Sequence, residues 1–328
     1  MSLAPVIIFN YNRPDHSRQV WEALSRNELA IDTELYLYCD GPKANASDEM
    51  RQRIADLHAQ AKQYAMDARK AVKFKDVHVV CAETNKGLAN SIIGGVSEVI
   101  AEHGRVIVLE DDLLTSPNFL KYMNTALDKY ESYPAVFSIG GYNFPPQKMP
   151  IPKDYPYDAF VSLRCCSWGW ATWKEKWERI DWSLDYLDEF LKHPEQIRAF
   201  NRGGDDLTNM LLLQRDHKID SWAIRYGFQH FYHHAVTIIP CVSYVDNIGC
   251  DGSGSHCADL GNAMRNNLET SISNPHFPDM LYEDRRIVNA FYKNNSFIQL
   301  PIWKRVIRKI YRHFGALPPV YIEPRVYM

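Results

Sequence analysis

The sequence predicts an α/β fold in which helices cover both faces of a mostly parallel sheet. Over residues 1–145, short continuous apolar segments alternate with longer segments of helical periodicity. The apolar segments lack the polar and apolar alternation that marks a strand with one solvated face, so both faces of the sheet are expected to be covered. Apolar residues make up 46% of the 328 residues, which is enough for a substantial core.

Each element of this first part has a local signal. Apolar strands are expected at residues 4–11, 34–40, 76–81 and 105–111. Helices are expected from Pro14, after Ser47 as N-cap, over 88–103, and from Pro117 with Ser116 as N-cap. The alternation of strand and helix favours a Rossmann-like sheet.

After residue 145 the pattern changes. Residues 143–160 are rich in proline and aromatic residues, which predicts a long ordered loop. Further helices are expected near 170–177, 184–192 and 205–217, a strand near 235–245, a Gly/Ser-rich loop at 247–257 and a basic helix at 302–315. We divide the chain into residues 1–145, 146–262 and a C-terminal tail, 263–328.

Composition excludes several classes of function. The net charge of −3 provides no general attraction to nucleic acid, so no nucleic-acid partner is expected. The seven cysteines include no CxxC pair, and the spacing of Cys250, His256 and Cys257 fits no common zinc site. No signal peptide and no apolar segment of about 20 residues is apparent, so a cytoplasmic protein is expected.

Polar residues follow the four strands, at the edge of the sheet where open parallel sheets bind ligands. Arg13 follows the first strand, Asp40 the second, Lys86 the third, and residues 110–112 the fourth. Neither GxGxxG nor GxxxxGK[ST] follows the first strand, which disfavours dinucleotide and P-loop sites.

Glu110, Asp111 and Asp112 are consecutive carboxylates at the end of an apolar strand. A hydrated Mg²⁺ or Mn²⁺ that bridges them to a substrate diphosphate would relieve their repulsion. The alternative is that they only favour the positive end of the helix expected at Pro117.

The segment "VIVLEDDLLTSPNFLKYM" resembles the signature of GT-A-fold glycosyltransferases in which Glu-Asp-Asp replaces the usual Asp-x-Asp motif. The similarity is greatest to the N-acetylglucosaminyltransferase I type and to related bacterial sugar transferases. It continues in order along residues 5–257 through "NYNRP", "YCDGP", "CCSWGWATWKEKW", "GGDDLTNMLL" and "DNIGCDGSGSH".

The resemblance implies a role for each matched position. Arg13 and Asp40 would hold the uridine end of a UDP-sugar, and Asp112 would bind Mn²⁺ or Mg²⁺. Asp205 or Asp206 would be the general base. Further donor contacts would come from Lys86, Glu110, Asp111, Gly252, Ser253 and His256, and acceptor contacts from Trp168 and Trp170. Residues 1–145 would then bind the donor, and residues 146–262 would bind the acceptor and carry the base.

Several assignments keep an alternative. Asp205 and Asp206 also fit the pattern of acidic residues at the N-terminus of the helix that follows them. Trp170, Trp173 and Trp177 have the spacing of one helix face, so core packing is expected for at least two of them. The loop at 247–257 is either a closing segment over the donor or a plain surface loop. Residues 303–314 either contact a membrane or dock on the domain.

The function expected from these motifs is inverting, metal-dependent transfer of N-acetylglucosamine or a related hexose from a UDP-sugar. The acceptor would be a glycan or lipid-linked saccharide of a bacterial surface polysaccharide such as lipopolysaccharide. One alternative is a sugar nucleotidyltransferase, but that class usually has a glycine-rich loop after the first strand, and "FNYNRPDHS" has no glycine. Another is a non-catalytic protein that binds nucleotide sugars or glycans.

Overall fold

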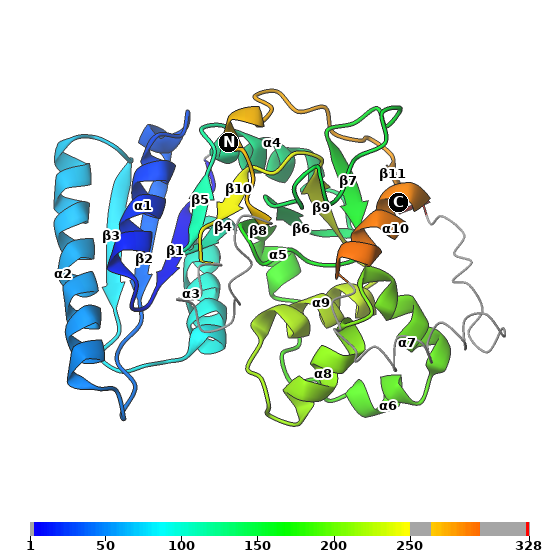
Figure 1. Ribbon diagram of the computed structural model, residues 1–328, viewed down its shortest axis with the longest axis horizontal. Helices are drawn as coiled ribbons and strands as arrows, with labels where there is room; N and C mark the ends of the chain where they lie inside the picture. Colours follow the sequence, from blue (N-terminus) through cyan, green and yellow to red (C-terminus); the bar gives the residue numbers. More distant parts are fainter. Residues whose placement is uncertain (1–2, 250–263, 296–325, 328) are drawn as a thin grey trace.

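The computed structural model describes residues 3–249, 264–295 and 326–327, and within them it contains a mixed sheet of eight strands (Figure 1). The strand order is β3-β2-β1-β4-β8-β6-β9-β7, and β7 and β8 run against the other six. The strands are β1 Val6–Asn10, β2 Glu34–Cys39, β3 Asp76–Cys81, β4 Arg105–Glu110, β6 Val136–Gly140, β7 Ala159–Ser162, β8 Trp170–Trp173 and β9 Val236–Pro240. The predicted α/β class with a mostly parallel sheet is confirmed.

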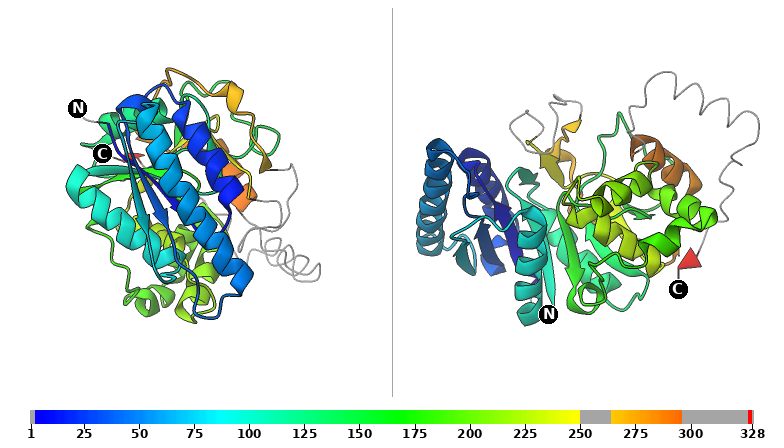
Figure 2. Two further views of the ribbon diagram at one scale, coloured as in Figure 1. Left: turned by 90° about the vertical axis from the view of Figure 1, so that its left-hand side faces the viewer. Right: turned by 90° about the horizontal axis from the view of Figure 1, so that it is seen from below.

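Helices cover both faces of the sheet, as the continuous apolar strands predict. One core contains apolar residues of α1 (Pro14–Ser25), α2 (Asp48–Lys70) and α4 (Phe119–Tyr130) together with every second residue of β1 and β2. The other contains residues of α3 (Leu88–His103) and α9 (Trp222–Tyr232) with the remaining positions of β1. Figure 2 shows α1 and α2 side by side over the strands.

The other elements are short and surround this sheet. A cluster of apolar side chains joins α6 (Leu187–Leu191), α7 (Pro194–Phe200) and α8 (Leu207–Arg215) to α9, beneath the sheet in Figure 1. The remaining elements are the helices α5 Lys174–Trp177 and α10 Arg285–Asn295, the 3-10 turns Ala30–Asp32, Asn201–Gly203 and Leu268–Thr270, and the paired strands β5 Leu113–Thr115 with β10 Val245–Asn247 and β11 Leu281–Tyr282 with β12 Val326–Tyr327. Within the described ranges, no helix is both long and apolar enough to cross a membrane.

The helix predicted across the tryptophans is wrong. Trp170–Trp173 is the strand β8, hydrogen-bonded between β4 and β6, and only residues 174–177 are helical. Trp170 therefore faces the α3 side of the sheet and Trp173 the α4 side, because successive strand residues point to opposite faces. All three tryptophans at 170, 173 and 177 are nevertheless buried, which confirms the expected core packing.

Two further element predictions need correction. The helix expected from Pro117 begins at Phe119 and has no side-chain cap. Asn118 occupies the N-cap position, and the buried Ser116 Oγ makes no hydrogen bond among the described residues, so Ser116 is not the N-cap. The Ser116 N–H donates to Tyr244 O (2.9 Å), next to the β5–β10 ribbon. The loop predicted at 143–160 ends too late, because residues 159–162 form the edge strand β7, which pairs with β9. Its four residues are too short a segment to stand out from the aromatic loop before it.

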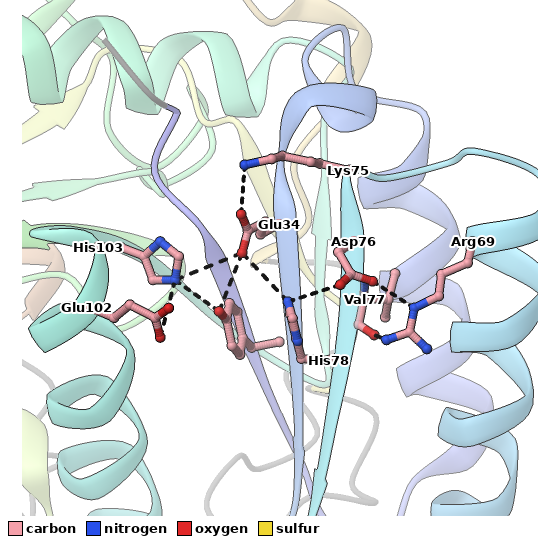
Figure 3. A network of polar contacts seen from close by, with 9 residues as sticks. Glu34, Arg69, Lys75, Asp76, Val77, His78, Glu102 and His103 are labelled. Carbon is pink, nitrogen blue, oxygen red and sulfur yellow. Dashed lines mark hydrogen bonds and ion pairs between the residues drawn. The ribbon is translucent and has the colours of Figure 1, made fainter.

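A network of charged groups covers the other edge strand, β3, at the amino ends of β2 and β3 (Figure 3). The Arg69 guanidinium of α2 donates to Val77 O and lies 2.7 Å from the Asp76 carboxylate. Lys75 Nζ lies 2.8 Å from Glu34 Oε1. These contacts engage a backbone carbonyl and add charge along an edge that could otherwise pair with another strand. The cluster is thus explained by protection of β3.

His230 gives the fold a defined sensitivity to acid. The ring is 2% exposed, its Nδ1 donates to Tyr226 O (2.9 Å), and its Nε2 lies 3.0 Å from Ser138 Oγ. Burial lowers the pKa of His230 to about 4. Between that value and the ordinary 6.5 the unfolded chain binds a proton that the folded protein does not. The stability from neutral His230 is therefore complete above pH 6.5 and is lost as the pH falls.

We expect this histidine to contribute a slope of up to about 1.4 kcal/mol per pH unit to the free energy of unfolding over that interval. Urea unfolding of the wild type and of His230→Gln between pH 4 and 7 measures the slope. The variant is less stable at pH 7 because the substitution disturbs the packed core, but its free energy should fall less steeply with acid. Parallel curves for the two proteins would contradict the assignment.

Candidate active site

A cavity of about 550 Å³ opens at the carboxyl ends of β1, β2, β3 and β4, beside the first half of α3. Strands that run in parallel bring their carboxyl ends to one edge of the sheet, so side chains far apart in the sequence meet there. The volume is in the range of small-molecule sites. Among the residues lining it are seven predicted site residues: Arg13, Asp40, Lys86, Glu110, Asp111, Asp112 and Trp168.

The three consecutive carboxylates differ in environment. Glu110 ends β4, and Asp111 and Asp112 form the turn before β5. Burial, together with the charges of Asp112 and Asp111, raises the pKa of Glu110 to about 8. Burial also raises the pKa of Asp111, against the opposing effect of Arg13. In the metal-free protein the raised pKa favours the protonated form of Glu110, which reduces the repulsion in the cluster.

Arg13 offsets much of the remaining negative charge. Its Nη2 forms an ion pair with Asp111 Oδ1 and lies 2.9 Å from Asp112 Oδ2. Burial alone would lower the pKa of Arg13, but the two aspartates raise it above its ordinary value. The guanidinium thus lies against the acid cluster, whereas the sequence motif predicts contact with uridine. Its Nη1 is buried and has no hydrogen-bond partner among the described residues.

Gly249 completes this cluster; it lies in the segment "DNIGCDGSGSH", but the sequence motifs assign it no role. A Cβ at this position would clash with Asp112 Oδ2 and come within 2.8 Å of Arg13 Nη1. The neighbouring Ile248 N–H donates to Asp112 O (2.9 Å), so the segment after β10 is tied to the acid turn. The sequence shows only a glycine directly after "VDNI". That glycine indicates a close approach to the acid turn only once Asp112 is known to lie against it.

Asp40 organises the far side of the cavity. Its Oδ1 accepts hydrogen bonds from the backbone N–H groups of Gly41 (2.9 Å) and Lys86 (2.8 Å). Its Oδ2 accepts from Asn85 Nδ2 (2.8 Å) and from the Gly87 N–H (3.1 Å). Four protein donors engage the acceptor sites of a carboxylate, so Asp40 holds the 85–87 turn in place.

The turn held by Asp40 leads into the N-terminus of α3, which faces the cavity. Gly87 precedes the helix with φ of +79°, a conformation that favours glycine, and no side chain caps the first turn. Lys86, Gly87 and Leu88 all line the cavity. Uncapped N–H groups and the helix dipole attract anions, so this wall is suited to a phosphate group.

The acid cluster offers a divalent cation few protein ligands. In the part of the chain that the structure describes, no group of three or more His, Cys, Asp or Glu side chains converges on one point. The raised pKa of Glu110 disfavours its charged form, and Asp111 is 5% exposed and engaged by Arg13 and by the Tyr11 N–H. Arg13 also contacts Asp112, through Oδ2, but the Asp112 side chain is more exposed than that of Asp111 (15% against 7%), so Asp112 is the more accessible of the two to a cation. Mg²⁺ is often held by one or two carboxylates, with substrate phosphates and water as its other ligands.

Of the two predicted acceptor tryptophans, only Trp168 lies at the cavity. Trp168 is partly exposed and packs edge-on against Tyr142, with ring centroids 4.6 Å apart. Trp170 is 1% exposed and stacks on Trp177 and Trp222. The expected acceptor contact of Trp170 is therefore wrong, because its ring lies in the protein core.

The two candidate bases, Asp205 and Asp206, have different partners. Both oxygens of Asp206 are held by Arg164, whose Nη1 and Nη2 lie 2.7 and 2.9 Å away. Asp206 precedes α8 but makes no side-chain capping hydrogen bond. Asp205 instead accepts a hydrogen bond from the Tyr292 hydroxyl of α10. Neither aspartate lines the 550 Å³ cavity.

The remaining predicted contacts, Gly252, Ser253 and His256, lie outside the described residues, as does the basic segment 303–314. The first part of the predicted tail, residues 264–295, contributes Phe277, Leu281 and Ile287 to the same core as β1 and β2.

Residues 97–203 match the GNT-I family. The matched segment contains the acid cluster and Trp168, and it ends just before the two aspartates at 205 and 206. No curated protein matches the sequence.

Among solved structures, S. aureus TarS 1–349 is similar with 12% identity and a TM-score of 0.41, over 74% of this chain and 60% of that one. The galactosyltransferase LgtC, in complex with donor and acceptor sugar analogs, is similar with 9% identity and a TM-score of 0.35, over 69% of this chain and 70% of that one. The chain thus spans less than two thirds of the TarS chain, and these likenesses are too distant to assign any residue. Over residues 97–203 the chain resembles the glycosyltransferases of the GNT-I family, as its sequence motifs predict.

Proposed function

We propose that the protein is an inverting, metal-dependent GT-A glycosyltransferase that uses a UDP-sugar. The observation that carries the proposal is the convergence of Arg13, Lys86 and the acid turn at 110–112 on one cavity, at the carboxyl ends of the strands. The cavity offers an uncapped helix N-terminus to a diphosphate, and it offers a cation Asp112, the more exposed of the two aspartates that contact Arg13. The family match over residues 97–203 supports sugar transfer as the reaction class.

In the proposed reaction Asp205 accepts the proton of the acceptor hydroxyl as its oxygen attacks the anomeric carbon. A new carbon–oxygen bond forms, the bond from that carbon to the diphosphate breaks, and UDP leaves with the electron pair. We assign the base to Asp205 and not to Asp206 because both Asp206 oxygens are engaged by the Arg164 guanidinium. Mn²⁺ or Mg²⁺ bound at Asp112 would offset charge on the departing diphosphate. Arg13 and Lys86 contribute positive charge to the same cavity.

The donor sugar is proposed to be N-acetylglucosamine or a related hexose, and the acceptor a glycan or lipid-linked saccharide of a bacterial surface polysaccharide. This setting implies work in the cytoplasm at the inner face of the membrane, with residues 303–314 as a peripheral contact. Trp168, whose ring reaches the cavity, is the proposed stacking surface for a sugar ring.

The proposal is tested by a thermal-shift screen of nucleotide sugars and free nucleotides with and without Mn²⁺. A UDP-sugar should raise the melting temperature more with Mn²⁺ than without it, because ligands that bind only the folded state stabilise it. Positive donors are then assayed for hydrolysis and for transfer to saccharide acceptors. Stabilisation without any turnover would favour the non-catalytic alternative. Turnover of a nucleoside triphosphate with a sugar phosphate would favour a nucleotidyltransferase.

Asp40→Asn is expected to weaken UDP binding by roughly 1–3 kcal/mol, the range for hydrogen bonds to a charged group. The NH₂ group of the asparagine would face N–H groups that now donate hydrogen bonds to the carboxylate. Because those bonds hold the 85–87 turn, the turn would move away from the cavity. Calorimetric titration with UDP measures the change. Asp15→Asn, at the exposed start of α1, is the matched control and should leave the affinity unchanged. Unaltered affinity in Asp40→Asn would remove the turn from the donor site.

A further inference from the structure

Asp205 is contacted by a residue far along the chain. The hydroxyl of Tyr292, in α10, donates a hydrogen bond to Asp205 Oδ1. The sequence offers no hint of this pairing, because 87 residues separate the two and α10 falls in the predicted tail. Asp206, one residue away, is held by the Arg164 guanidinium instead, so the two aspartates have separate supports.

Contacts that do not involve the Tyr292 hydroxyl hold α10 in place. Ile287 is 1% exposed, and Phe291 packs edge-on against Phe144 and Phe160, with ring centroids 5.7 and 6.0 Å apart. Asn294 Nδ2 donates to Lys148 O (3.0 Å). Because these contacts anchor the helix, loss of one hydroxyl should leave α10 where it is.

The turn that carries Asp205 fits closely against the end of this helix. Gly204 has φ of +151°, and a Cβ there would lie 2.5 Å from Asp206 Oδ1, 2.6 Å from Arg164 Nη1 and 3.1 Å from Asn295 Cβ. Only glycine leaves room for the helix and the ion pair together. The position of the aspartates is thus set from both sides, by Arg164 and by α10.

Aromatic contacts connect α10 to the donor cavity. Trp168 packs on Tyr142 (4.6 Å), Tyr142 on Phe144 (5.9 Å), and Phe144 on Phe291, the neighbour of Tyr292. Packed rings of this kind deform little, so the place of α10 relative to the cavity wall is well defined. Residues 285–295 therefore belong structurally to the same half of the molecule as Trp168.

We propose that Tyr292 is a positioning residue for Asp205, and that α10 is an integral part of the acceptor side of the active site. The inference rests on the proposed function, in which Asp205 is the general base. The Tyr292 hydroxyl fixes one carboxylate oxygen and so sets the direction in which Asp205 meets the acceptor hydroxyl. An error of about 1 Å in such a geometry can reduce a rate by roughly two orders of magnitude.

The test is Tyr292→Phe, with sugar transfer and donor binding measured separately. We expect kcat for transfer to fall roughly 10- to 100-fold, while the KM for the donor stays within about twofold. In the Asp205→Asn background the same substitution should add almost nothing, because the residue that it positions is already disabled. Tyr133→Phe is the matched control, since it removes a tyrosine hydroxyl that donates to the Asp279 carbonyl elsewhere.

Hydrogen exchange of the amides at 204–208 provides a readout that does not need an active enzyme. Faster exchange there in Tyr292→Phe, with unchanged exchange in α10, supports the positioning role. Unchanged exchange together with full transfer in Tyr292→Phe overturns it. So does a further fall in transfer when Tyr292→Phe is added to Asp205→Asn, if that fall is as large as in the wild-type background. A wild-type protein that transfers no sugar from any nucleotide donor overturns the proposed function. The exchange result then decides separately whether Tyr292 holds the turn.

Discussion

Replacing Asp205 by asparagine is expected to lower sugar transfer by roughly 10²–10⁴-fold, the usual contribution of a general base. The substitution keeps the shape of the side chain and an oxygen that can accept from the Tyr292 hydroxyl, but it removes the proton acceptor. Donor affinity should be unchanged, since Asp205 does not line the donor cavity. Steady-state transfer and calorimetric titration with UDP, on the same preparation, separate the two effects.

Asp206→Asn is the control for this prediction, and a different result is expected for it from its contacts. It breaks a two-point ion pair with Arg164 in which both side chains are 20% exposed. We therefore expect a lower melting temperature, with transfer per folded molecule reduced much less than in Asp205→Asn. If Asp206→Asn were the inactive variant while Asp205→Asn remained active, the base would be assigned to the wrong aspartate. Full transfer in both variants would mean that neither is the base.

Asp112→Asn is expected to abolish transfer and the Mn²⁺-dependent part of donor stabilisation. The acid cluster would lose the carboxylate that is available to a cation, and Asp111 would keep Arg13 as its partner. The folded protein should be at least as stable as the wild type without metal, because one charge is removed from a crowded cluster. Thermal shifts by a UDP-sugar with and without Mn²⁺ measure both effects.

Asp56→Asn, on the exposed face of α2, is the matched control for Asp112→Asn and should behave as the wild type. Near-normal transfer by Asp112→Asn in Mn²⁺ would show that the cation, if the reaction uses one, is bound elsewhere. Loss of stability without metal would show that Asp112 supports the fold through Arg13.

The architecture of the first half followed from local signals. Continuous apolar strands between amphipathic helices specify a sheet covered on both sides, and the carboxyl ends of parallel strands meet at one edge wherever the connections are regular. That rule alone predicts that Arg13, Asp40, Lys86 and the acid turn at 110–112 lie close together, and all of them line one cavity in the structure. The second half was less predictable because β7 and β8 have only four residues each and run against the other strands. In β8 the tryptophan spacing matched a helix, while pairing with β4 and β6 made it a strand.

The sequence by itself determined the α/β class, the rim on which the polar residues gather, and the chemistry that a run of three carboxylates can support. Tertiary structure alone decided which partner each charge has. Arg13 lies on the acids, Asp40 holds the 85–87 turn, and Asp205 and Asp206 are divided between Tyr292 and Arg164. Local sequence sets backbone preference and burial pattern over a few residues. The pairing of charges depends on contacts between segments as far as 150 residues apart in the sequence, and no periodicity encodes those contacts.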